Sequence, residues 1–282
     1  MPDRLTHLAT FLRVAERGSL TAAARDLSVS QPTVTRAIAA LERALGTTLF
    51  HRTTHSLSLT EPGRSLVPKA RRMLSAWDAL AEELAEDDAL TGPLHVVAPI
   101  ALGQTALIPV MAAFRTDHPG VTVNWQLTDE VVRLSETGAD LWIRVGDVPD
   151  DTLVQRRLGH VTRHVFGAPI FEKRPLRACP WITVGPYEGR QIALEGRTFE
   201  VAPVLNTNSI AVAARALVDG VGVAIAPDWY MRDDLEAGRV VRLGPPAAVL
   251  PVHLAFASDR RSRRLDAFMA AVTDRLKIDV LD

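Results

Sequence analysis

The chain has 282 residues, a formal net charge of −1, 47% hydrophobic residues and 23% charged residues. These proportions are ordinary for a soluble globular protein, and the length suits two or three compact units. The single cysteine, Cys179, excludes an internal disulfide and any metal site built on several cysteines, and it fits a reducing cytoplasm.

The charge is divided unevenly along the chain. Residues 1–76 carry 11 Lys or Arg and 5 Asp or Glu, whereas residues 77–282 carry 21 and 28. A basic segment joined to an acidic one suggests that the basic part binds a polyanion. DNA is the natural candidate, because basic side chains that bind its phosphates release counterions, which favours binding. Chance clustering would give the same counts, so the charge alone does not decide.

Two stretches bear on export and membranes. The first 18 residues carry charges throughout and lack an apolar core followed by a cleavage site, so we expect no signal peptide. The stretch from Ala89 to Phe114 has no Lys, Arg, Asp or Glu, but Pro93, Pro99 and Pro109 interrupt it. A buried strand followed by a buried helix explains it better than a membrane span does.

Residues 1–46 contain three stretches with the apolar spacing of amphipathic helices. The first ends at Gly18, after which Ser19 is placed to cap the second helix, LTAAARDL. Ser30 is placed to cap the third, and Pro32 falls in its first turn, where N–H groups lack an intrahelical partner. That helix runs through TVTRAIAALERAL and ends at Gly46.

The segment LFHRTTHSLSLT follows, with leucines around a polar tip. We interpret it as two short strands and a loop, the wing of a winged helix. Residues 1–60 are therefore expected to form one small domain in which a helix, a short turn and a second helix make a helix-turn-helix.

Polar residues at the start of the second helix of this motif have the chemistry to read DNA. Gln can bond adenine in the major groove, Arg can bond guanine or a phosphate, and a Thr methyl can touch a thymine methyl. Residues on the wing could reach phosphates or the minor groove. A solvated helix face is the alternative for any one residue, but the group favours DNA. The predicted DNA-binding residues are Ser30, Gln31, Pro32, Thr33, Thr35, Arg36, His51 and Arg52.

Residues 61–90 form the next unit, a long helix that begins at Glu61–Pro62–Gly63 and reaches about Asp88. It has an apolar seam of Leu66, Met73, Leu74, Trp77, Leu80, Ala81 and Leu84. A lone helix of this length must bury its seam on a partner, which predicts a coiled-coil homodimer, with a homotetramer as an open alternative.

From residue 94 onward short strands alternate with helices. The order LHVVAP, GQTALIPVMAAFRTDHP, VTVNWQL, VVRLSETG and DLWIRVG predicts a parallel sheet with helices on both faces. A second unit contains WITV, VAPVLN, the helix SIAVAARALVDG and the strand GVAIAP, and the chain closes with VHLAFA and the helix RSRRLDAFMAAVTDRL. Residues 91–282 are thus expected to form two Rossmann-like α/β lobes, the first about 94–164 and 266–282, the second about 165–265.

The amino-terminal segment resembles a known family. FLRVAERGSLTAAARDLSVSQPTVTRAIAALERALGTTLFHRTTHSLSLTEPG is similar to the DNA-binding signature of LysR-type transcriptional regulators. The shared pieces are the GSLT-AAA stretch, the SQP turn, the I-x-x-LE pair, the LG-x-x-LF run and LT-x-x-G. Two later stretches, from Leu94 to Gly146 and from Asn206 to Leu243, resemble the two halves of the family's effector-binding domain, so the resemblance covers nearly the whole chain.

The resemblance implies a cytoplasmic one-component regulator that binds an interrupted palindrome in double-stranded DNA and contacts RNA polymerase. It also implies an effector domain like a periplasmic binding protein, with a small molecule between its lobes. Whether the protein activates or represses stays open. The matching effector-binding positions are Ile100, Ala101, Gln104, Thr128, Arg144, Gly146, Asn206, Asn208 and Pro227.

The chain departs from the family pattern in two places. Between Ala168 and Asn206 it is shorter than expected, and the tyrosine–leucine–glycine pattern after Pro169 is absent. The turn after the first strand has Ile100 and Ala101 where relatives often place a hydroxyl. A simple carboxylate effector is therefore less favoured, and an aromatic or mixed apolar–polar ligand is an equal alternative.

Two rival functions remain to be weighed against a regulator. The α/β lobes could be a solute-binding module of transport, but the attached DNA reader and the missing export signal argue against that. They could carry an enzyme, but the sequence offers no Ser–His–Asp arrangement or paired carboxylates, so we expect no catalysis. His51 and His55 lie on a predicted loop without a third ligand, so we expect no metal and no cofactor.

Overall fold

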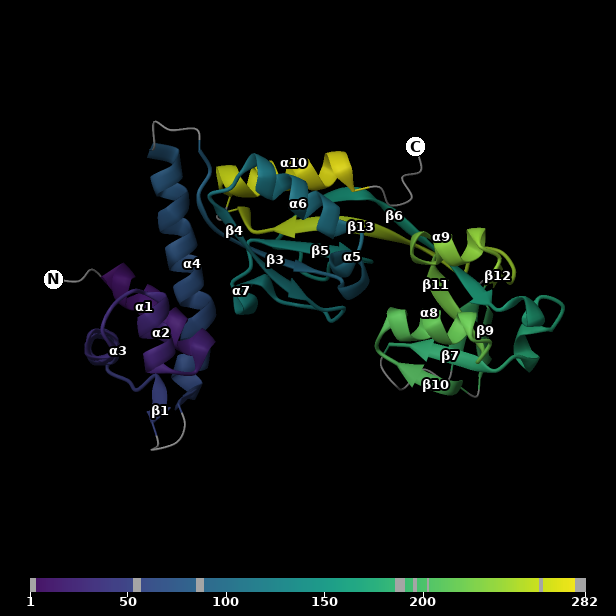
Figure 1. Ribbon diagram of the computed structural model, residues 1–282, viewed down its shortest axis with the longest axis horizontal. Helices are drawn as coiled ribbons and strands as arrows, with labels where there is room; N and C mark the ends of the chain where they lie inside the picture. The colour runs from purple at the N-terminus through teal and green to yellow at the C-terminus, as the bar shows by residue number, and fades with distance from the viewer. Residues whose placement is uncertain are drawn as a thin grey trace.

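The computed structural model describes residues 4–52, 57–84, 89–185, 191–194, 197–201, 203–258 and 261–276. Its amino-terminal part is a cluster of three helices, a short hairpin and a long helix (Figure 1). These elements are α1 (Arg4–Arg17), α2 (Leu20–Asp26), α3 (Gln31–Leu45), β1 (Phe50–Arg52), β2 (Leu57–Leu59) and α4 (Glu61–Leu84). The predicted polar tip of the wing, residues 53–56, and the predicted end of the long helix, residues 85–88, lie outside the described residues.

The helices begin and end at the residues that the sequence predicted as caps. Ser19 Oγ accepts a hydrogen bond from Ala22 N at 3.3 Å, and Ser30 Oγ accepts one from Thr33 N at 3.3 Å. Each cap satisfies an N–H that has no partner within its helix. Gly46 closes α3 in the left-handed region with a φ of 65°, which a residue without Cβ adopts at little cost. The predictions for these three positions are confirmed.

The inward faces of α1, α2 and α3 share one small core with the hairpin. Phe11, Val14, Val34, Ile38 and Leu49 are almost fully buried in it. The rings of Phe11 and Phe50 lie with centroids 5.5 Å apart, so the wing packs directly on α1.

The predicted seam of α4 is divided between two environments. Leu66 and Leu74 pack against the amino-terminal core. Met73, Trp77, Leu80 and Leu84 are instead exposed by 48% or more in the single chain. An exposed apolar row of this kind is what a second copy would cover.

A different, polar row of α4 faces the rest of the chain. Arg71 Nη1 donates to the carbonyl of Thr137 at 3.3 Å, and Ser75 Oγ donates to Asp140 Oδ1 at 2.9 Å. Asp78 Oδ2 lies 3.9 Å from Arg264 Nη2. Because residues 71, 75 and 78 lie on one helix face, this row docks α4 along the first α/β lobe.

One mixed sheet runs through the carboxy-terminal part, in the order β10-β7-β11-β6-β13-β5-β3-β4, with β12 paired to β6. Its strands are β3 (Gly92–Ala98), β4 (Val121–Leu127), β5 (Leu141–Val145), β6 (Val154–Gly167), β7 (Trp181–Val184), β10 (Pro203–Thr207), β11 (Val223–Pro227), β12 (Val241–Arg242) and β13 (Ala248–Phe256). A separate hairpin pairs β8 (Gln191–Leu194) with β9 (Arg197–Glu200).

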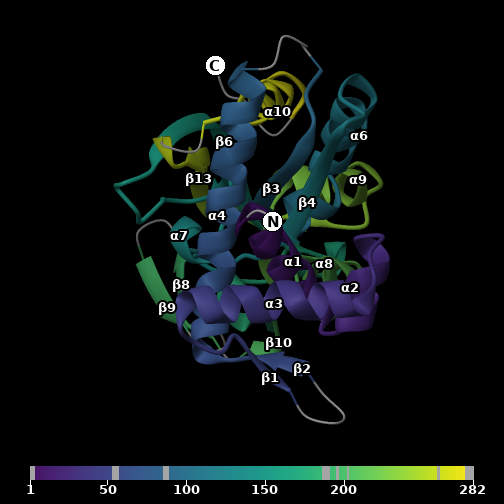
Figure 2. The same cartoon turned by 90° about the vertical axis from the view of Figure 1, so that its left-hand side faces the viewer.

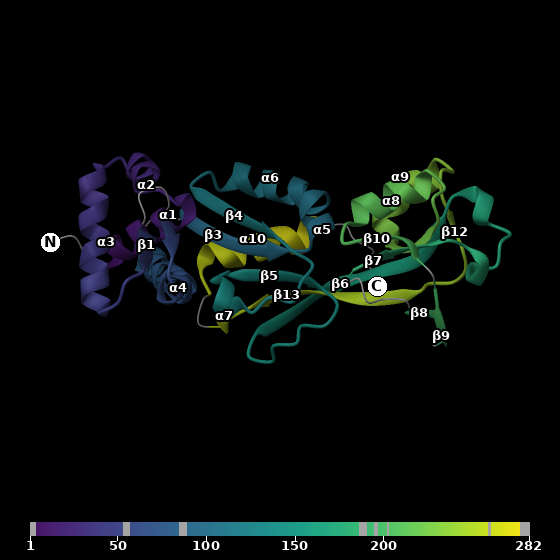
Figure 3. The same cartoon turned by 90° about the horizontal axis from the view of Figure 1, so that it is seen from below.

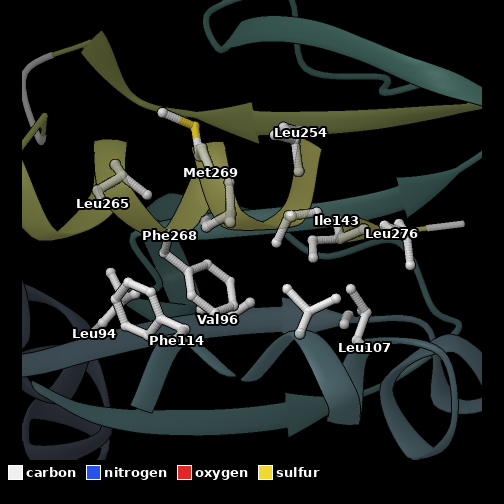
Figure 4. Packing of buried hydrophobic residues seen from close by; sticks show 14 of the residues in the cluster. Leu94, Val96, Leu107, Phe114, Ile143, Leu254, Leu265, Phe268, Met269 and Leu276 are labelled. Atoms are coloured by element: carbon white, nitrogen blue, oxygen red, sulfur yellow. The ribbon is translucent and has the colours of Figure 1, made fainter. Parts of the chain in front are cut away.

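The first lobe is built on β3, β4 and β5, which are parallel as predicted. Helices α6 (Leu107–Asp117) and α10 (Arg263–Arg275) cover one face, where Phe114 and Phe268 meet edge to face with centroids 5.0 Å apart. Figure 4 shows Leu94, Val96 and Leu254 in the same buried cluster as these rings. The short helix α7 (Leu134–Thr137) covers Trp142 on the other face.

The second lobe is built on β7, β10 and β11, which are also parallel. Helices α8 (Ile210–Val218) and α9 (Asp228–Glu236) cover one face. The other face is covered by the region that is short compared with the family pattern. Among the described residues it carries two 3-10 turns, η1 (Pro169–Phe171) and η2 (Leu176–Ala178), and the β8–β9 hairpin.

The predicted parallel order holds within each lobe, but the sheet as a whole is mixed. Strands β6 and β13 are antiparallel to each other and to the strands beside them, and they run from one lobe into the other (Figure 3). Their long pairing, from Ala248 opposite Arg163 to Phe256 opposite Val154, joins the lobes into one sheet. The sequence pattern identified the second half of β13, VHLAFA, but missed β6, because polar and apolar residues do not alternate cleanly along that strand.

The single helix predicted over residues 103–119 is wrong. The segment forms α5 (Ile100–Gln104) and α6, with a break at Thr105. Pro109 has no N–H to donate to the carbonyl four residues earlier, and its ring crowds that carbonyl, which belongs to Thr105. The helix predicted over 131–138 shortens to α7, and no described helix is long and apolar enough to cross a membrane.

Candidate nucleic-acid interface and ligand site

The first turn of α3 presents most of its polar side chains to solvent. Ser30, Gln31, Pro32, Thr33 and Arg36 are exposed. Val34, Ala37, Ile38 and Leu41 of the same helix are buried in the amino-terminal core. The helix is therefore anchored by one face and free to approach a partner with the other, as the sequence pattern predicted.

Two of the predicted DNA-reading side chains bond within their own helix. Arg36 Nε donates to the Pro32 carbonyl at 3.3 Å, and Arg36 Nη2 lies 3.5 Å from Thr33 Oγ1. Thr35 is half-buried and its hydroxyl donates to the Gln31 carbonyl at 3.1 Å. These contacts hold the exposed Arg36 side chain against the first turn of α3.

The wing lies at the same end of the molecule as α3 (Figure 2). His51 is exposed and pairs with Ser58 across the antiparallel hairpin. Arg52 ends β1, and its side chain lies outside the described residues. The structure thus brings together the helix residues and His51, which come from segments about 15 residues apart in the sequence.

The predicted effector residues of the first lobe cluster where its parallel strands end. Ile100, Ala101 and Gln104 lie in α5, directly after β3, whereas Thr128 follows β4. Arg144 is near the end of β5 and Gly146 follows it with a φ of 95°. His253 Nδ1 lies 3.2 Å from the Gly146 carbonyl. This edge is where open α/β sheets place ligands.

Asp129, which the sequence analysis did not single out, organises this cluster. Its Oδ1 accepts a hydrogen bond from Ile100 N at 3.1 Å, and its carbonyl accepts one from Arg144 Nη1 at 3.0 Å. Arg144 also lies over the Trp142 ring, 5.5 Å from the centroid. The sequence signal that could have revealed Asp129 is an acidic residue two positions after the end of β4. The Asp129 carboxylate already takes the Ile100 N–H at the start of α5, and its negative charge disfavours an anionic ligand there.

The predicted residues of the second lobe lie at the matching edge. The Asn206 side chain accepts a hydrogen bond from the Thr183 hydroxyl, which joins β10 to β7. Asn208 is exposed and precedes Ser209, which caps α8 by accepting from Val212 N at 3.4 Å. Pro227 is half-buried at the end of β11, opposite Arg163 of β6. Burial lowers the pKa of the Arg163 guanidinium.

A cluster of three polar side chains beside Pro227 was also missed. His164 Nδ1 lies 2.6 Å from Asp228 Oδ1, and Arg242 Nη2 lies 2.8 Å from Asp228 Oδ2. The three residues come from β6, the start of α9 and β12. Separations of 64 and 14 residues left no local pattern by which the sequence could have revealed the cluster.

The structure therefore gathers the predicted effector residues into two groups, one at each lobe. Helix α5 of the first lobe and helix α8 of the second lie on the sides of the lobes that face each other (Figures 1 and 3). Strands β6 and β13 run between the groups. Such an arrangement suits a ligand that touches both lobes and responds to their separation.

Two family models match the chain. Residues 5–64 match the family described as "Bacterial regulatory helix-turn-helix protein, lysR family", and residues 87–277 match the family described as "LysR substrate binding domain". Together they span the helix-turn-helix, the wing and both α/β lobes.

Curated relatives and solved structures agree with these matches. The HTH-type transcriptional activator AaeR of Escherichia coli K12 is 31% identical, over 86% of this chain and 83% of its own length. The HTH-type regulator YhjC of the same organism is 29% identical, over 95% and 96%. Full-length LysG from Corynebacterium glutamicum, solved with bound effector Arg, has a TM-score of 0.62 at 24% identity, covering 96% of this chain and 97% of that one. ArgP from Mycobacterium tuberculosis has a TM-score of 0.69 at 19% identity, covering 96% of each.

Proposed function

The chain belongs to the LysR family of bacterial regulatory proteins, and from this we propose that residues 1–60 read DNA, residues 61–90 join two copies and residues 91–282 sense a small molecule. It is a transcription regulator with a DNA-binding helix-turn-helix and an effector-binding domain. The observation that carries the assignment of the reading surface is the exposed, polar first turn of α3 above a fully buried apolar face.

Two copies read DNA together in this proposal. The exposed row Met73, Trp77, Leu80 and Leu84 of α4 pairs with the same row of a second copy, giving a homodimer that can assemble further into a homotetramer. Each α3 enters a major groove, so two half-sites are spaced by about one helical turn of DNA, roughly 34–36 Å, as an interrupted palindrome. His51 and Arg52 on the wing contact the backbone or the minor groove.

The effector binds between the two groups of residues at the lobe edges. Asp129 occupies the start of α5, and Ile100 and Ala101 add apolar surface there. These features support a ligand of mixed apolar and polar character, which Gln104, Thr128 and Asn208 hydrogen-bond. A plain carboxylate would meet the Asp129 carboxylate at this end of the first lobe.

Effector binding acts as a population shift between arrangements of the lobes. A ligand that prefers the closed lobes changes how the two copies sit on DNA, and thereby DNA bending and contact with RNA polymerase. The regulatory role of the relatives supports a chain that works without catalysis, in the cytoplasm where the DNA is.

The test is a gel-shift titration of the full chain against the DNA upstream of its own coding region. We expect sequence-dependent binding whose affinity falls steeply with salt, and a change in that affinity with an effector found by thermal-shift screening. Binding that does not distinguish this DNA from a scrambled duplex would reject the reading surface. Thr128→Ala and Asn208→Ala should lose the thermal shift and keep DNA binding, whereas an effector response that survives both variants would reject the effector site.

A further inference from the structure

A cavity of about 350 Å³ lies between the DNA-binding domain, the linker helix and the first lobe. Helices α1 and α4 form two of its walls, and the first halves of β3 and β4 form the third (Figure 2). Its polar lining includes Arg13, Glu16, Arg71, Ser75, His95 and Asn124. A second hollow of about 230 Å³ shares Glu16, Arg71, His95 and Asn124. This is enough room for a small ligand.

The cavity is separate from the proposed effector site. It is lined by Gly92, Pro93 and His95 at the beginning of β3, whereas the effector residues follow the end of the same strand at Ala98. Strands rise about 3.3 Å per residue, so His95 and Ile100 lie on the order of 15 Å apart along the chain direction. A ligand here would contact the DNA-binding domain, which the lobe edges do not touch.

The Glu16 carboxylate already pairs with two arginines in this cavity. Glu16 Oε2 lies 3.3 Å from Arg13 Nη1, and Glu16 Oε1 lies 3.5 Å from Arg71 Nη2. Glu16 is the only acidic side chain among the described residues that line the two hollows. Its side chain is 39% exposed, and exposed ion pairs contribute little to stability because water competes for both partners. The Glu16 carboxylate is thus bound only weakly by Arg13 and Arg71, so another anion can replace it.

Arg71 is fixed independently of Glu16. Its Nη1 donates to the Thr137 carbonyl of the first lobe at 3.3 Å. Gly138 permits this approach, because a Cβ there would lie 3.0 Å from Arg71 Cβ. Arg71 Nε is buried with no hydrogen-bond partner among the described residues, so neither Glu16 nor Thr137 saturates the guanidinium.

Two other carboxylates near the cavity are engaged elsewhere. Asp26 Oδ2 lies 3.8 Å from Arg13 Nη1 but pairs more closely with Arg17 Nε, at 2.5 Å. Asp140 Oδ1 accepts from Ser75 Oγ at 2.9 Å, and Asp140 Oδ2 accepts from His95 N at 2.9 Å. Asp140 is 2% exposed, so its oxygens do not line the open space. The sheet wall of the cavity instead offers neutral polar groups, including the Asn124 amide, which lies 3.5 Å from His95 Nε2.

We propose that this cavity is a binding site for a small anion, a carboxylate or phosphate group, which replaces the Glu16 carboxylate on Arg71 and Arg13. Charge-assisted hydrogen bonds from arginine suit both groups. Arg71 remains on the first lobe through Thr137, whereas Glu16 belongs to α1 of the DNA-binding domain. Exchange of one anion for the other therefore releases the Glu16 side chain from Arg71, and the ligand takes over the bridge between Arg13 of α1 and Arg71 of α4.

The experiment is calorimetric titration of the full chain with inorganic phosphate and, separately, with malonate, at constant ionic strength set with chloride. We expect saturable binding of at least one anion, and the anion that binds identifies the headgroup. Glu16→Gln should tighten that binding about tenfold because the competing carboxylate is gone. Glu172→Gln, which removes the same charge from an exposed position of the second lobe, should leave it unchanged.

Arg71→Gln should abolish the binding, with Arg177→Gln on the exposed η2 turn as the matched control. Amide exchange over residues 13–18 should change when the anion binds to the wild-type chain, because Glu16 leaves Arg71 and the ligand takes its place on Arg13. Failure of both anions to saturate, equal affinities for wild type and Glu16→Gln, or binding that leaves this exchange unchanged would each overturn the proposal. Because Glu16→Gln is a gain of affinity, misfolding of a variant cannot imitate it.

Discussion

The Glu42 carboxylate accepts a hydrogen bond from the backbone N–H of Leu49 at 2.8 Å. The same oxygen lies 3.4 Å from Phe50 N, at the first residue of β1. One side chain of the recognition helix α3 thus satisfies the two N–H groups through which the chain enters the wing. This gives a physical role to the Glu of the I-x-x-LE stretch, because it fixes the wing relative to α3, the helix proposed to read DNA.

Replacing Glu42 by Ala should lower the free energy of opening of the wing by about 1–3 kcal/mol, since both N–H groups lose a charged acceptor. Glu42→Gln keeps an acceptor oxygen and should cost less. Native-state amide exchange at Leu49 and Phe50 in the full chain measures this directly. Glu61→Ala, which removes a surface pair with Arg64, should change it little, and an equal effect of the two alanine variants would contradict the role of Glu42.

Replacing Gly63 by Ala should destabilise the junction between the wing and α4 by about 1–3 kcal/mol, because there is no room for a methyl group. A Cβ at Gly63 would lie 2.2 Å from the Leu49 carbonyl oxygen, which is backbone and cannot turn away. Ser65→Ala, on the exposed face of the same helical turn, is the control and should stay within about 0.5 kcal/mol. Thermal unfolding followed by circular dichroism compares the two. Similar melting temperatures would refute the tight contact.

Ser30 can be tested for two roles at once. Ser30→Ala removes the cap of α3 and should cost about 1 kcal/mol of stability. Ser30→Asp keeps a capping oxygen, so the melting temperature should stay close to that of the wild type, but the added negative charge should weaken DNA binding. Loss of stability in both variants would mean that the Ser30 hydroxyl matters for something other than the cap.

Arg36→Ala should weaken specific DNA binding by about 1–3 kcal/mol and relax the sequence preference, if Arg36 reads a base. Arg43→Ala removes the same charge from the last turn of the same helix, away from the exposed first turn, and should weaken binding less. Gel shifts at several salt concentrations separate base reading from phosphate contact, because loss of a phosphate contact reduces the salt slope. If the two variants bind alike, the orientation of α3 on DNA proposed above is wrong.

His95 should make stability depend on pH. Burial lowers the pKa of the His95 imidazole from its ordinary 6.5, and Arg71 and Arg264 lower it further, against the opposing charges of Asp140 and Glu16. Below pH 6.5 the unfolded chain therefore binds more protons at this residue than the folded chain does, so folding stability falls as the pH drops from 6.5 through the lowered pKa.

His95→Asn should reduce the loss of melting temperature between pH 7 and pH 5.5, because the group that titrates differently is gone. His51→Asn, which changes an exposed histidine of the wing, should leave that loss unchanged. Differential scanning calorimetry of the three proteins at several pH values makes the comparison. An unchanged pH dependence in His95→Asn would rule out His95 as its source.

The sequence by itself determined the parts of this protein whose causes are local. Caps at Ser19 and Ser30, the left-handed Gly46 and the apolar spacing of α1 and α3 depend on residues within about one helical turn. They therefore fixed the helix-turn-helix and the exposure of Gln31, Thr33 and Arg36. The parallel groups of strands in each lobe followed from alternating strands and helices in the same way.

Only the tertiary structure decided how these parts meet. The pairing of β6 with β13 joins residues about 100 positions apart, and Ser75 reaches Asp140 across 65. The periodicity around each of these residues does not specify such a partner, so the mixed sheet, the cap of α5 by Asp129 and the Glu16–Arg71 contact could not be predicted. The division of α4 into a polar row toward its own lobe and an exposed apolar row has the same origin. A helix pattern shows which residues share a face, whereas packing of the whole chain decides what that face meets.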